Sequence, residues 1–524
     1  MLSAGAADAP AIYSGQQVLT YDQLRAWARG CALRLLREGL EPGDRVGLFC
    51  ENSPFFVAAY LGAMCAGLCA VPLPIDGSEK TLAGAIAATG MKQILVSTRL
   101  LAKLRPLAKR FGAGLLASSE PFAQPESATG SASALSGSTI RGSKIPGVAG
   151  LEQGSALAEP VAPGEGSVLA KPVAPGDLAA ILLTSGSSGE PKGVMVTHGN
   201  ILGNTRDIIA YMSLAAQDRV MVVLPFSYCY GLSLLHTHLA AGGSLVLNNR
   251  FLFPEKVLDE LEQKQCSGLA GVPATYQILL RKTHFARRRF PALRWLQQAG
   301  GKLPDPFLRE LRQAFPAVKL FVMYGQTEGT ARLSYLPPER LEDKLGSIGR
   351  GLAHTRLEVL KPDGTPVRPG SGEVGEIVAT GDNITPGYWN DAEETARFFR
   401  HGKLYTGDLA RVDRDGFLFV VERSRDFIKA LGNRVSPKEV EEVIAELPQV
   451  IEVAAIGFPH DIWGEAIKAF VVTTTPDSLT AEQVRAHCLR RLPNYKVPEC
   501  VEFLPALPKT SHGKVDRQRL KGGV

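Results

Sequence analysis

Hydrophobic residues in the first part of the chain follow two spacings that alternate along the sequence. The spacing over Tyr21–Glu38 is that of an amphipathic helix, whereas Arg45–Phe49 and Gln93–Ser97 are short apolar runs typical of strands. Helices and strands that alternate in this way are typical of βαβ units around a mostly parallel sheet. The amino-terminal part of the chain therefore predicts an α/β fold.

No charged residue occurs in Asn52–Ile75, a stretch long enough to cross a bilayer. Two prolines interrupt its end, and Ala and Gly outnumber Leu and Ile within it. We therefore expect a buried helix at Pro54–Gly67 and a buried strand at Leu68–Pro72, and no membrane span.

The stretch Ala117–Gly176 is rich in Ser, Ala, Gly and Pro and has almost no aromatic residues. Within it, Ser155–Glu165 nearly repeats as Ser167–Asp177, and two copies are too few for a solenoid. We expect a flexible surface insertion with a local duplication and without a catalytic role. A segment that docks a partner is the alternative.

After the insertion the pattern returns to helices and strands, and in the last third it becomes strands with glycine-rich turns. An apolar strand is expected at Leu178–Leu183, and the alternation continues to about Val322. Later strands are expected at Val374–Thr380, Leu404–Tyr405, Gly416–Val421, Val450–Gly457 and Ala469–Thr473, and helices at Pro437–Glu446 and Ala481–Arg491. We interpret the final block as a small α+β domain, so that residues 1–424 form a large domain and residues 425–524 a small one.

The composition agrees with two domains, because 524 residues exceed what one hydrophobic core usually supports. The net charge of +6 is small for this length, and no run of Lys and Arg indicates nucleic-acid binding. The 8 cysteines form neither a Cys-x-x-Cys pair nor a zinc-binding spacing, so we expect buried thiols in a reducing compartment. Met1–Pro10 lacks the features of a secretory signal, and we expect a cytoplasmic protein.

A serine- and glycine-rich segment, Thr184–Gly193, directly follows the predicted strand. Such a turn exposes several backbone N–H groups that bind phosphate oxygens. It differs from the P-loop of common nucleotide hydrolases, because Pro191 precedes Lys192 and the chain continues as a strand. The candidate phosphate-binding residues are Thr184, Ser185, Gly186, Ser187, Ser188, Gly189 and Lys192.

The string at Leu182–His198, LLTSGSSGEPKGVMVTH, resembles the signature of the adenylate-forming superfamily. This superfamily contains acyl- and aryl-CoA synthetases, the adenylation domains of nonribosomal peptide synthetases, and firefly luciferase. The resemblance covers nearly the whole chain apart from the insertion. It implies a large α/β domain with mixed and parallel sheets and a distorted β-barrel, followed by a small mobile α+β domain. It also implies that ATP and Mg²⁺ are used to convert a carboxylic acid to an acyl-adenylate, with release of pyrophosphate, before the acyl group passes to a thiol.

The motif Tyr324–Glu328 follows the apolar strand Leu320–Met323, and strand ends are where α/β folds place ligands. In the family this motif closes on the nucleotide, and its glutamate coordinates magnesium. A magnesium ion held mainly by phosphate oxygens needs few protein carboxylates. The residues implied here are Tyr324 and Gly325 at the nucleotide, Thr327 and Glu328 in catalysis, and Thr184 and Glu328 at the metal.

Three further segments resemble the family's nucleotide site. Tyr405–Asp408 matches the motif whose aspartate holds both ribose hydroxyls, for which a carboxylate has the acceptors. Arg423 matches an arginine that also reaches the ribose. Ala299–Lys302 matches the segment that lines the adenine, where Gly300 and Gly301 permit close approach of the backbone.

Lys514 resembles the catalytic lysine near the carboxyl end of the family. Because the carboxylate and ATP are both anionic, a cation between the carboxylate and the α-phosphate would stabilise the charge in the transition state. Lys514 and the phosphate segment fall in different predicted domains, so a closure step is expected. The resemblance implies a hinge at Arg425 and, in a second arrangement of the domains, a thiol channel lined by Gly432.

The segment expected to contact the acid, Pro225–Gly231, contains no acidic residue. This disfavours α-amino acids, whose buried ammonium would lack a partner. Tyr228 stands where many CoA synthetases have a histidine. The candidate walls of the acid pocket are Tyr228, Gly271, Val272, Tyr276, Ala299 and Met323, and their mixture favours an apolar or aromatic acid.

The sequence contains no carrier domain and no Gly-Gly-x-Ser attachment sequence, so we expect the thiol to come from CoA or from a separate carrier protein. CoA is favoured. The second hypothesis is a stand-alone adenylation enzyme that loads an acyl or amino acid onto a carrier protein. A catalytically silent nucleotide-binding relative is disfavoured by the presence of Lys514 and Glu328, and a luciferase-like oxygenase has no specific support. The choice between a monomer and a homodimer is open.

Overall fold

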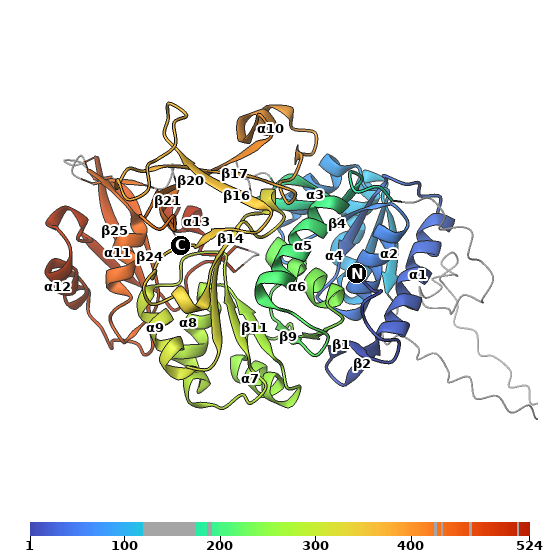
Figure 1. The fold of residues 1–524 in the computed structure, drawn as a ribbon, viewed down its shortest axis with the longest axis horizontal. Coiled ribbons are helices and arrows are strands. Elements are labelled where there is room, and N and C mark those ends of the chain that lie inside the picture. Colours follow the sequence, from blue (N-terminus) through green and yellow to red (C-terminus); the bar gives the residue numbers. More distant parts are fainter. Residues whose placement is uncertain are drawn as a thin grey trace, which may run out of the picture.

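The computed structural model describes residues 1–118, 173–185, 191–423, 427–430, 433–460, 464–510 and 513–523, and these residues form four β-sheets (Figure 1). The two large sheets are mostly parallel, one of the smaller sheets is antiparallel, and the other is mixed. The predicted α/β fold is confirmed. The first repeated segment, Ser155–Glu165, and residues 167–172 of the second lie outside the described residues.

The first large sheet has 7 strands and carries the amino-terminal half of the site. Its central strands are parallel, while β8 and β18 are antiparallel to their neighbours. The order across the sheet is β18 (Gly387–Tyr388), β8 (Pro191–Thr197), β7 (Leu178–Ser185), β4 (Cys69–Pro72), β3 (Arg45–Phe49), β5 (Gln93–Ser97) and β6 (Gly114–Ser118).

The second large sheet has 9 strands, and the segments expected to bind the acid and the nucleotide follow its central strands. The order is β15 (Arg350–Gly351), β14 (Ser334–Leu336), β13 (Lys319–Tyr324), β12 (Trp295–Gln298), β11 (Gly268–Gly271), β9 (Arg219–Val222), β10 (Ser244–Leu247), β1 (Pro10–Ser14) and β2 (Gln17–Thr20). Strands β13, β12, β11 and β9 run parallel, so the residues after them gather at one edge.

Helices separate and cover these sheets (Figure 1). Helices α5 and α6 lie between the two large sheets, and one hydrophobic core continues from one sheet to the other. The helices of the large sheets are α1 (Tyr21–Arg37), α2 (Pro54–Cys65), α3 (Glu79–Thr89), α4 (Leu101–Phe111), α5 (His198–Met212), α6 (Cys229–Ala240), α7 (Pro254–Gln263), α8 (Pro273–Lys282) and α9 (Asp305–Ala314).

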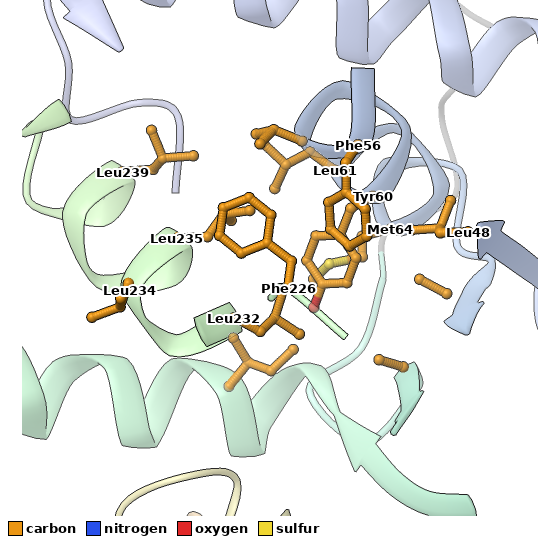
Figure 2. Close-up of a cluster of buried hydrophobic side chains, with 14 of the residues drawn as sticks. Leu48, Phe56, Tyr60, Leu61, Met64, Phe226, Leu232, Leu234, Leu235 and Leu239 are labelled. Carbon is orange, nitrogen blue, oxygen red and sulfur yellow. The ribbon is translucent and has the colours of Figure 1, made fainter. Parts of the chain in front are cut away.

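Helix α2 forms about half of the uncharged stretch Asn52–Ile75, and the structure buries this helix inside the protein. The Ser53 hydroxyl accepts a hydrogen bond from the Phe56 backbone and so caps the first turn. Phe56 and Tyr60 pack against Phe226 and the leucines of α6 (Figure 2), and the Tyr60 hydroxyl lies 3.0 Å from Nε2 of His236. Among the described residues, no helix has the length and apolarity needed to cross a bilayer.

The third sheet has five antiparallel strands and lies in the part of the chain expected to consist of strands with glycine-rich turns. It joins β16 (Thr355–Leu360), β17 (Gly375–Gly381), β20 (Lys403–Val412), β19 (Phe399–Arg400) and β21 (Leu418–Arg423), with α10 (Ala392–Phe398) beside it. In register, Asp408 on β20 lies opposite Arg423 on β21.

The last part of the chain has a sheet and a hydrophobic core of its own. Its strands are β23 (Asn433–Val435), β22 (Ile428–Ala430), β25 (Gly464–Thr473), β24 (Val450–His460) and β26 (Cys500–Phe503), and its helices are α11 (Pro437–Ile444), α12 (Ala481–Arg491) and α13 (Arg517–Lys521). Ala445, directly after α11, packs into the core formed by α8 and α9. The carboxyl-terminal part therefore docks on the second large sheet.

Candidate active site

The two ends of the phosphate segment are held together by the β7–β8 pair. Thr184 and Lys192 are partners in the strand register, and the Thr184 hydroxyl donates a hydrogen bond to the Lys192 carbonyl at 3.4 Å. The residues between these ends that are expected to bind phosphate, Gly186, Ser187, Ser188 and Gly189, lie outside the described residues, as does the side chain of Ser185. The structure thus fixes the base of the segment.

The Lys192 side chain is oriented by two residues that come later in the chain. Its ammonium forms an ion pair with Glu394 at the start of α10 and lies 5.7 Å from the centroid of the Tyr388 ring. Tyr388 reaches this position because β18 pairs with β8, and Tyr388 is the register partner of Val194 in this pair. A lysine expected to contact phosphate therefore has a fixed carboxylate partner on the protein.

Tyr388 also connects this region to Glu328. Its hydroxyl donates a hydrogen bond to Glu328 Oε1 at 2.7 Å. Burial, followed by the charge of Glu328, raises the pKa of the Tyr388 phenol, so the phenol remains a proton donor at neutral pH. The contact places the Glu328 carboxylate beside the base of the phosphate segment.

The oxygen atoms of Glu328 and Thr184 are ligands of the kind that Mg²⁺ prefers. The described residues contain no cluster of three or more His, Cys, Asp or Glu side chains suited to a metal. This composition fits an ion that takes most of its ligands from phosphate and water and only one carboxylate from the protein.

Tyr324 and Asp408, expected on separate grounds to meet the nucleotide, contact each other. The Tyr324 hydroxyl donates a hydrogen bond to Asp408 Oδ2 at 2.6 Å. The chain turns back directly after Tyr324, and a Cβ on Gly325 would lie 1.8 Å from the carbonyl oxygen of Ala331. Only glycine allows this approach. Arg423 lies opposite Asp408 in register, and its side chain is outside the described residues.

The turn after β12 brings the adenine segment against the expected acid pocket. Gly300 has a φ of +88°, and a Cβ there would lie 2.9 Å from the Tyr228 hydroxyl oxygen and 3.0 Å from Val272. A side chain at position 300 would fill the space between Tyr228 and Val272. Beyond Gly301, the ammonium of Lys302 pairs with Glu442 of α11 at 2.9 Å. Lys302 therefore contacts the carboxyl-terminal part of the chain.

Lys514 extends from that part toward the same turn. Its Nζ lies 5.6 Å from the centroid of the Tyr228 ring, and its Cε would be 3.7 Å from a Cβ on Gly300. The Lys509–Val515 bridge and the hydrogen bond from the Thr510 backbone N–H to the Lys514 carbonyl form the hairpin that carries it. A cation of the last segment is thus placed where the acid and adenine segments meet.

The candidate walls of the acid pocket divide into two groups. Tyr228 and Val272 face Gly300, whereas Tyr276 is fully buried and its hydroxyl donates to the carbonyls of Leu269 and Gln297. Tyr276 therefore stabilises the packing of α8 on β11 and β12. A Cβ on Gly271 would lie 2.8 Å from the Thr275 side chain, so Gly271 permits the tight turn into α8. Met323 is buried under Tyr211, whose hydroxyl lies 3.2 Å from its sulfur.

The profile of the AMP-binding enzyme family matches residues 3–389, and that of the AMP-binding enzyme carboxyl-terminal domain matches residues 439–514. This chain belongs to the AMP-binding enzyme family. The resemblance to the adenylate-forming superfamily is thereby confirmed.

Several proteins named as CoA ligases or synthases are similar to the chain over nearly its whole length. A feruloyl-CoA synthase of Amycolatopsis is 32% identical over 98% of this chain and 95% of its own length. A long-chain-fatty-acid–CoA ligase of Escherichia coli is 30% identical over 98% of this chain and 92% of its own length. The structure of an o-succinylbenzoate coenzyme A synthetase from Bacillus subtilis, in complex with ATP and a magnesium ion, has a TM-score of 0.79 and 25% identity, covering 98% of this chain and 97% of that one.

The site of this AMP-binding enzyme contains side chains that sequence reasoning did not select. They are Tyr388, Glu394, Cys229, Arg332 and Glu442. Tyr388 and Glu394 belong to short elements without a motif, and Glu442 lies on an ordinary amphipathic helix. Cys229 directly follows the expected site residue Tyr228, whereas Arg332 lies four positions after Glu328. The expected hinge Arg425 and the expected channel residue Gly432 lie outside the described residues.

Proposed function

We propose that this chain is an AMP-forming acid–CoA ligase that uses ATP and Mg²⁺ to activate a small carboxylic acid whose carbon skeleton is apolar or aromatic. The observation that carries the proposal is the position of Lys514, whose ammonium lies over Tyr228 beside Gly300. A cation there borders both the acid and the nucleotide. The relatives named as CoA ligases support the acid–thiol chemistry.

In the first reaction, a carboxylate oxygen attacks the α-phosphorus of ATP, and the bond from that phosphorus to the bridging oxygen of pyrophosphate breaks. Lys514 stabilises the negative charge that develops on the oxygens between the two reactants. Asp408 accepts hydrogen bonds from the ribose hydroxyls, and Tyr324 holds the aspartate in position.

The same proposal assigns the phosphates to the segment between Thr184 and Lys192. Glu328, oriented by Tyr388, and Thr184 would hold the magnesium ion. Held there, the ion would supply positive charge beside the leaving pyrophosphate. Lys192 would exchange part of its contact with Glu394 for a phosphate oxygen.

In the second reaction, the thiolate of CoA attacks the acyl carbon, and AMP leaves. We propose that residues 425–524 turn about Arg425 between the two reactions, which removes Lys514 from the site and brings Gly432 to the thiol channel. Lys514 and the Lys302–Glu442 ion pair would then belong to the arrangement for adenylation.

The test is pyrophosphate release by the purified chain with ATP, Mg²⁺ and a panel of acids, with hydroxylamine to trap the acyl-adenylate. Aromatic and medium-chain acids should give hydroxamates, and addition of CoA should give acyl-CoA and AMP. Glycine and phenylalanine serve as amino-acid controls and should remain inactive. The absence of pyrophosphate with every acid would contradict the proposal. Hydroxamate formation without consumption of CoA would identify a carrier protein as the acceptor instead.

A further inference from the structure

Arg332 is buried, with 1% of its surface exposed, in the loop that follows the Tyr324–Glu328 motif. Thr330 and Ala331 before it have positive φ values of 56° and 105°, which turn the chain sharply. The carbonyl of Arg332 accepts hydrogen bonds from the side-chain amides of Asn204 and Asn383, at 2.8 and 2.7 Å. The backbone of this arginine is therefore fixed from two sides.

The Arg332 guanidinium has no anionic partner among the residues that the structure describes. Nη1 contacts the sulfur of Met323, the Tyr230 ring lies 5.1 Å from Cζ, and Nε makes no hydrogen bond to the described residues. An arginine keeps its charge when buried, and a buried charge without a partner is costly. The Tyr230 ring and the Met323 thioether stabilise the charge of the guanidinium only in part.

The polar neighbours of the guanidinium are neutral at physiological pH. Burial raises the pKa of the Tyr211 phenol to about 12, although Arg332 opposes the shift. Burial likewise raises the pKa of Tyr230 and of the Cys229 thiol. The positive charge is thus not balanced by a nearby tyrosinate or thiolate.

Arg332 borders the pocket that the proposed function assigns to the acid. Tyr230, on which it stacks, meets Tyr228 edge to face, with ring centroids 6.2 Å apart. Tyr228 is the ring under Lys514. Between the two tyrosines, Cys229 accepts a hydrogen bond from the Thr327 hydroxyl at 3.4 Å. Lys514 at Tyr228 and Arg332 at Tyr230 are therefore connected through the contact between these two rings.

We propose that Arg332 binds a second anionic group of the substrate, so that the acid activated by this chain is a dicarboxylic acid. This inference rests on the proposed function. One carboxylate would lie at Lys514 and react with ATP, and the other would accept paired hydrogen bonds from the guanidinium. Arg332 would act in selecting the substrate and would take no part in the bond-making steps.

The test compares matched acids that differ by one carboxylate: 3-phenylpropanoate with 3-(4-carboxyphenyl)propanoate, and hexanoate with adipate. A further acid is 3-(4-carboxyphenyl)propanoate with its ring carboxylate converted to the methyl ester. The kcat/KM for pyrophosphate release is expected to favour the dicarboxylate in at least one pair by about 10- to 100-fold, as for a charged hydrogen bond at a buried site. Arg332→Met should remove this preference, because kcat/KM falls more for the dicarboxylate than for the monoacid, and Arg332→Lys should keep part of it.

Arg206→Met is the matched control, because Arg206 is half-exposed and pairs with Asp382 on the surface. The preference of Arg206→Met for the dicarboxylate over the monoacid should equal that of the wild type. The inference is overturned if Arg332→Met lowers turnover of both acids of a pair equally, which indicates a structural role, or if the ester is preferred to the dicarboxylate. The melting temperature and ATP binding of each variant report whether it is folded.

Calorimetry separates this inference from the proposed function. If no acid releases pyrophosphate, the proposed function fails, and binding of adipate and of 3-(4-carboxyphenyl)propanoate still decides the role of Arg332. Binding by the wild type that weakens about 10-fold or more in Arg332→Met supports the inference. Equal binding by both proteins, or none by either, contradicts it.

Discussion

The ammonium of Lys514 lies 5.6 Å from the centroid of the Tyr228 ring, where a hairpin of the last segment meets the turn that begins α6. Gly513, with a φ of +75°, approaches Val272 on the same side. These contacts join the carboxyl-terminal part of the chain to the acid pocket. They correspond to the arrangement that we propose for adenylation.

Replacement of Lys514 by Ala is expected to separate the two reactions. Adenylation should slow by about 100-fold or more, since the variant lacks the cation between two anionic reactants. Thioester formation from supplied acyl-adenylate and CoA should change little, because Lys514 would be outside the site in that step. Pyrophosphate release and acyl-CoA formation from synthetic adenylate measure the two reactions separately. Equal loss of both would contradict this division, and Lys521→Ala, at an exposed position of α13, is the control.

The contact between Tyr324 and Asp408 predicts selectivity for the ribose. The wild type should use ATP better than 2′-deoxy-ATP or 3′-deoxy-ATP, because the buried carboxylate of Asp408 accepts both hydroxyls in the proposed site. Asp408→Ala should raise the KM for ATP by about 10- to 100-fold and remove most of the discrimination. Tyr324→Phe should have a smaller effect in the same direction. If Asp408→Ala still discriminates between ATP and the deoxy analogues, residues other than Asp408 bind the ribose hydroxyls.

The hydrogen bond from Tyr388 to Glu328 predicts a change in magnesium dependence. In Tyr388→Phe the carboxylate loses the donor that orients it, so half-maximal pyrophosphate release should require about 10-fold more Mg²⁺. The KM for the acid should stay unchanged. Tyr13→Phe, on β1 and outside the site, is the control. An unchanged magnesium requirement in Tyr388→Phe would show that the ion is bound without this carboxylate.

Local patterns in the sequence predict many elements of this fold closely. Strands β3 and β5 and helix α12 begin and end where the apolar spacing places them, since each is a complete apolar or amphipathic unit. Strands β24 and β25 are longer than predicted. Their antiparallel pairing continues into less apolar residues up to the His460–Gly464 pair, because the backbone hydrogen bonds of a hairpin do not require apolar side chains.

The site is predicted less completely, and the reason is also physical. Tyr324 and Asp408 lie in motifs, and their contact confirms that the motifs meet. Tyr388 lies in a strand of 2 residues and reaches the site only through pairing with β8. Arg332 looks like a surface charge in the sequence, and only the packing of α5 and α6 shows that it is buried. Such contacts depend on which strands become neighbours, and no local pattern contains that information.

Two buried histidines of α6 predict loss of stability in mild acid. Burial lowers the pKa of His236 to about 3 and that of His238 to about 4, against an ordinary value of 6.5. Below pH 6.5 the unfolded chain therefore binds more protons than the folded one, and stability falls with decreasing pH until about pH 3 for His236 and about pH 4 for His238.

Each of these histidines contributes up to about 1.4 kcal/mol per pH unit to that loss. In His236→Gln and in His238→Gln, the fall in the free energy of unfolding from pH 6.5 to pH 5, measured with urea, should be smaller than in the wild type. His401→Gln, at an exposed position, is the control. The same slope in all four proteins would contradict the neutral state of these histidines.

The ion pair between Lys302 and Glu442 predicts coupling between the carboxyl-terminal part and the first reaction. Although burial disfavours its charged form, the carboxylates of Glu442 and Asp305 raise the pKa of Lys302, so the ammonium is charged in this contact. Glu442→Gln should slow adenylation by about fivefold, as expected for a half-buried pair, and leave the use of supplied acyl-adenylate unchanged. Glu439→Gln, which removes a charge from the same helix, should have no such effect. A double-mutant cycle with Lys302→Met measures the pair directly, and a coupling energy near zero would show that this contact does not stabilise the arrangement for adenylation.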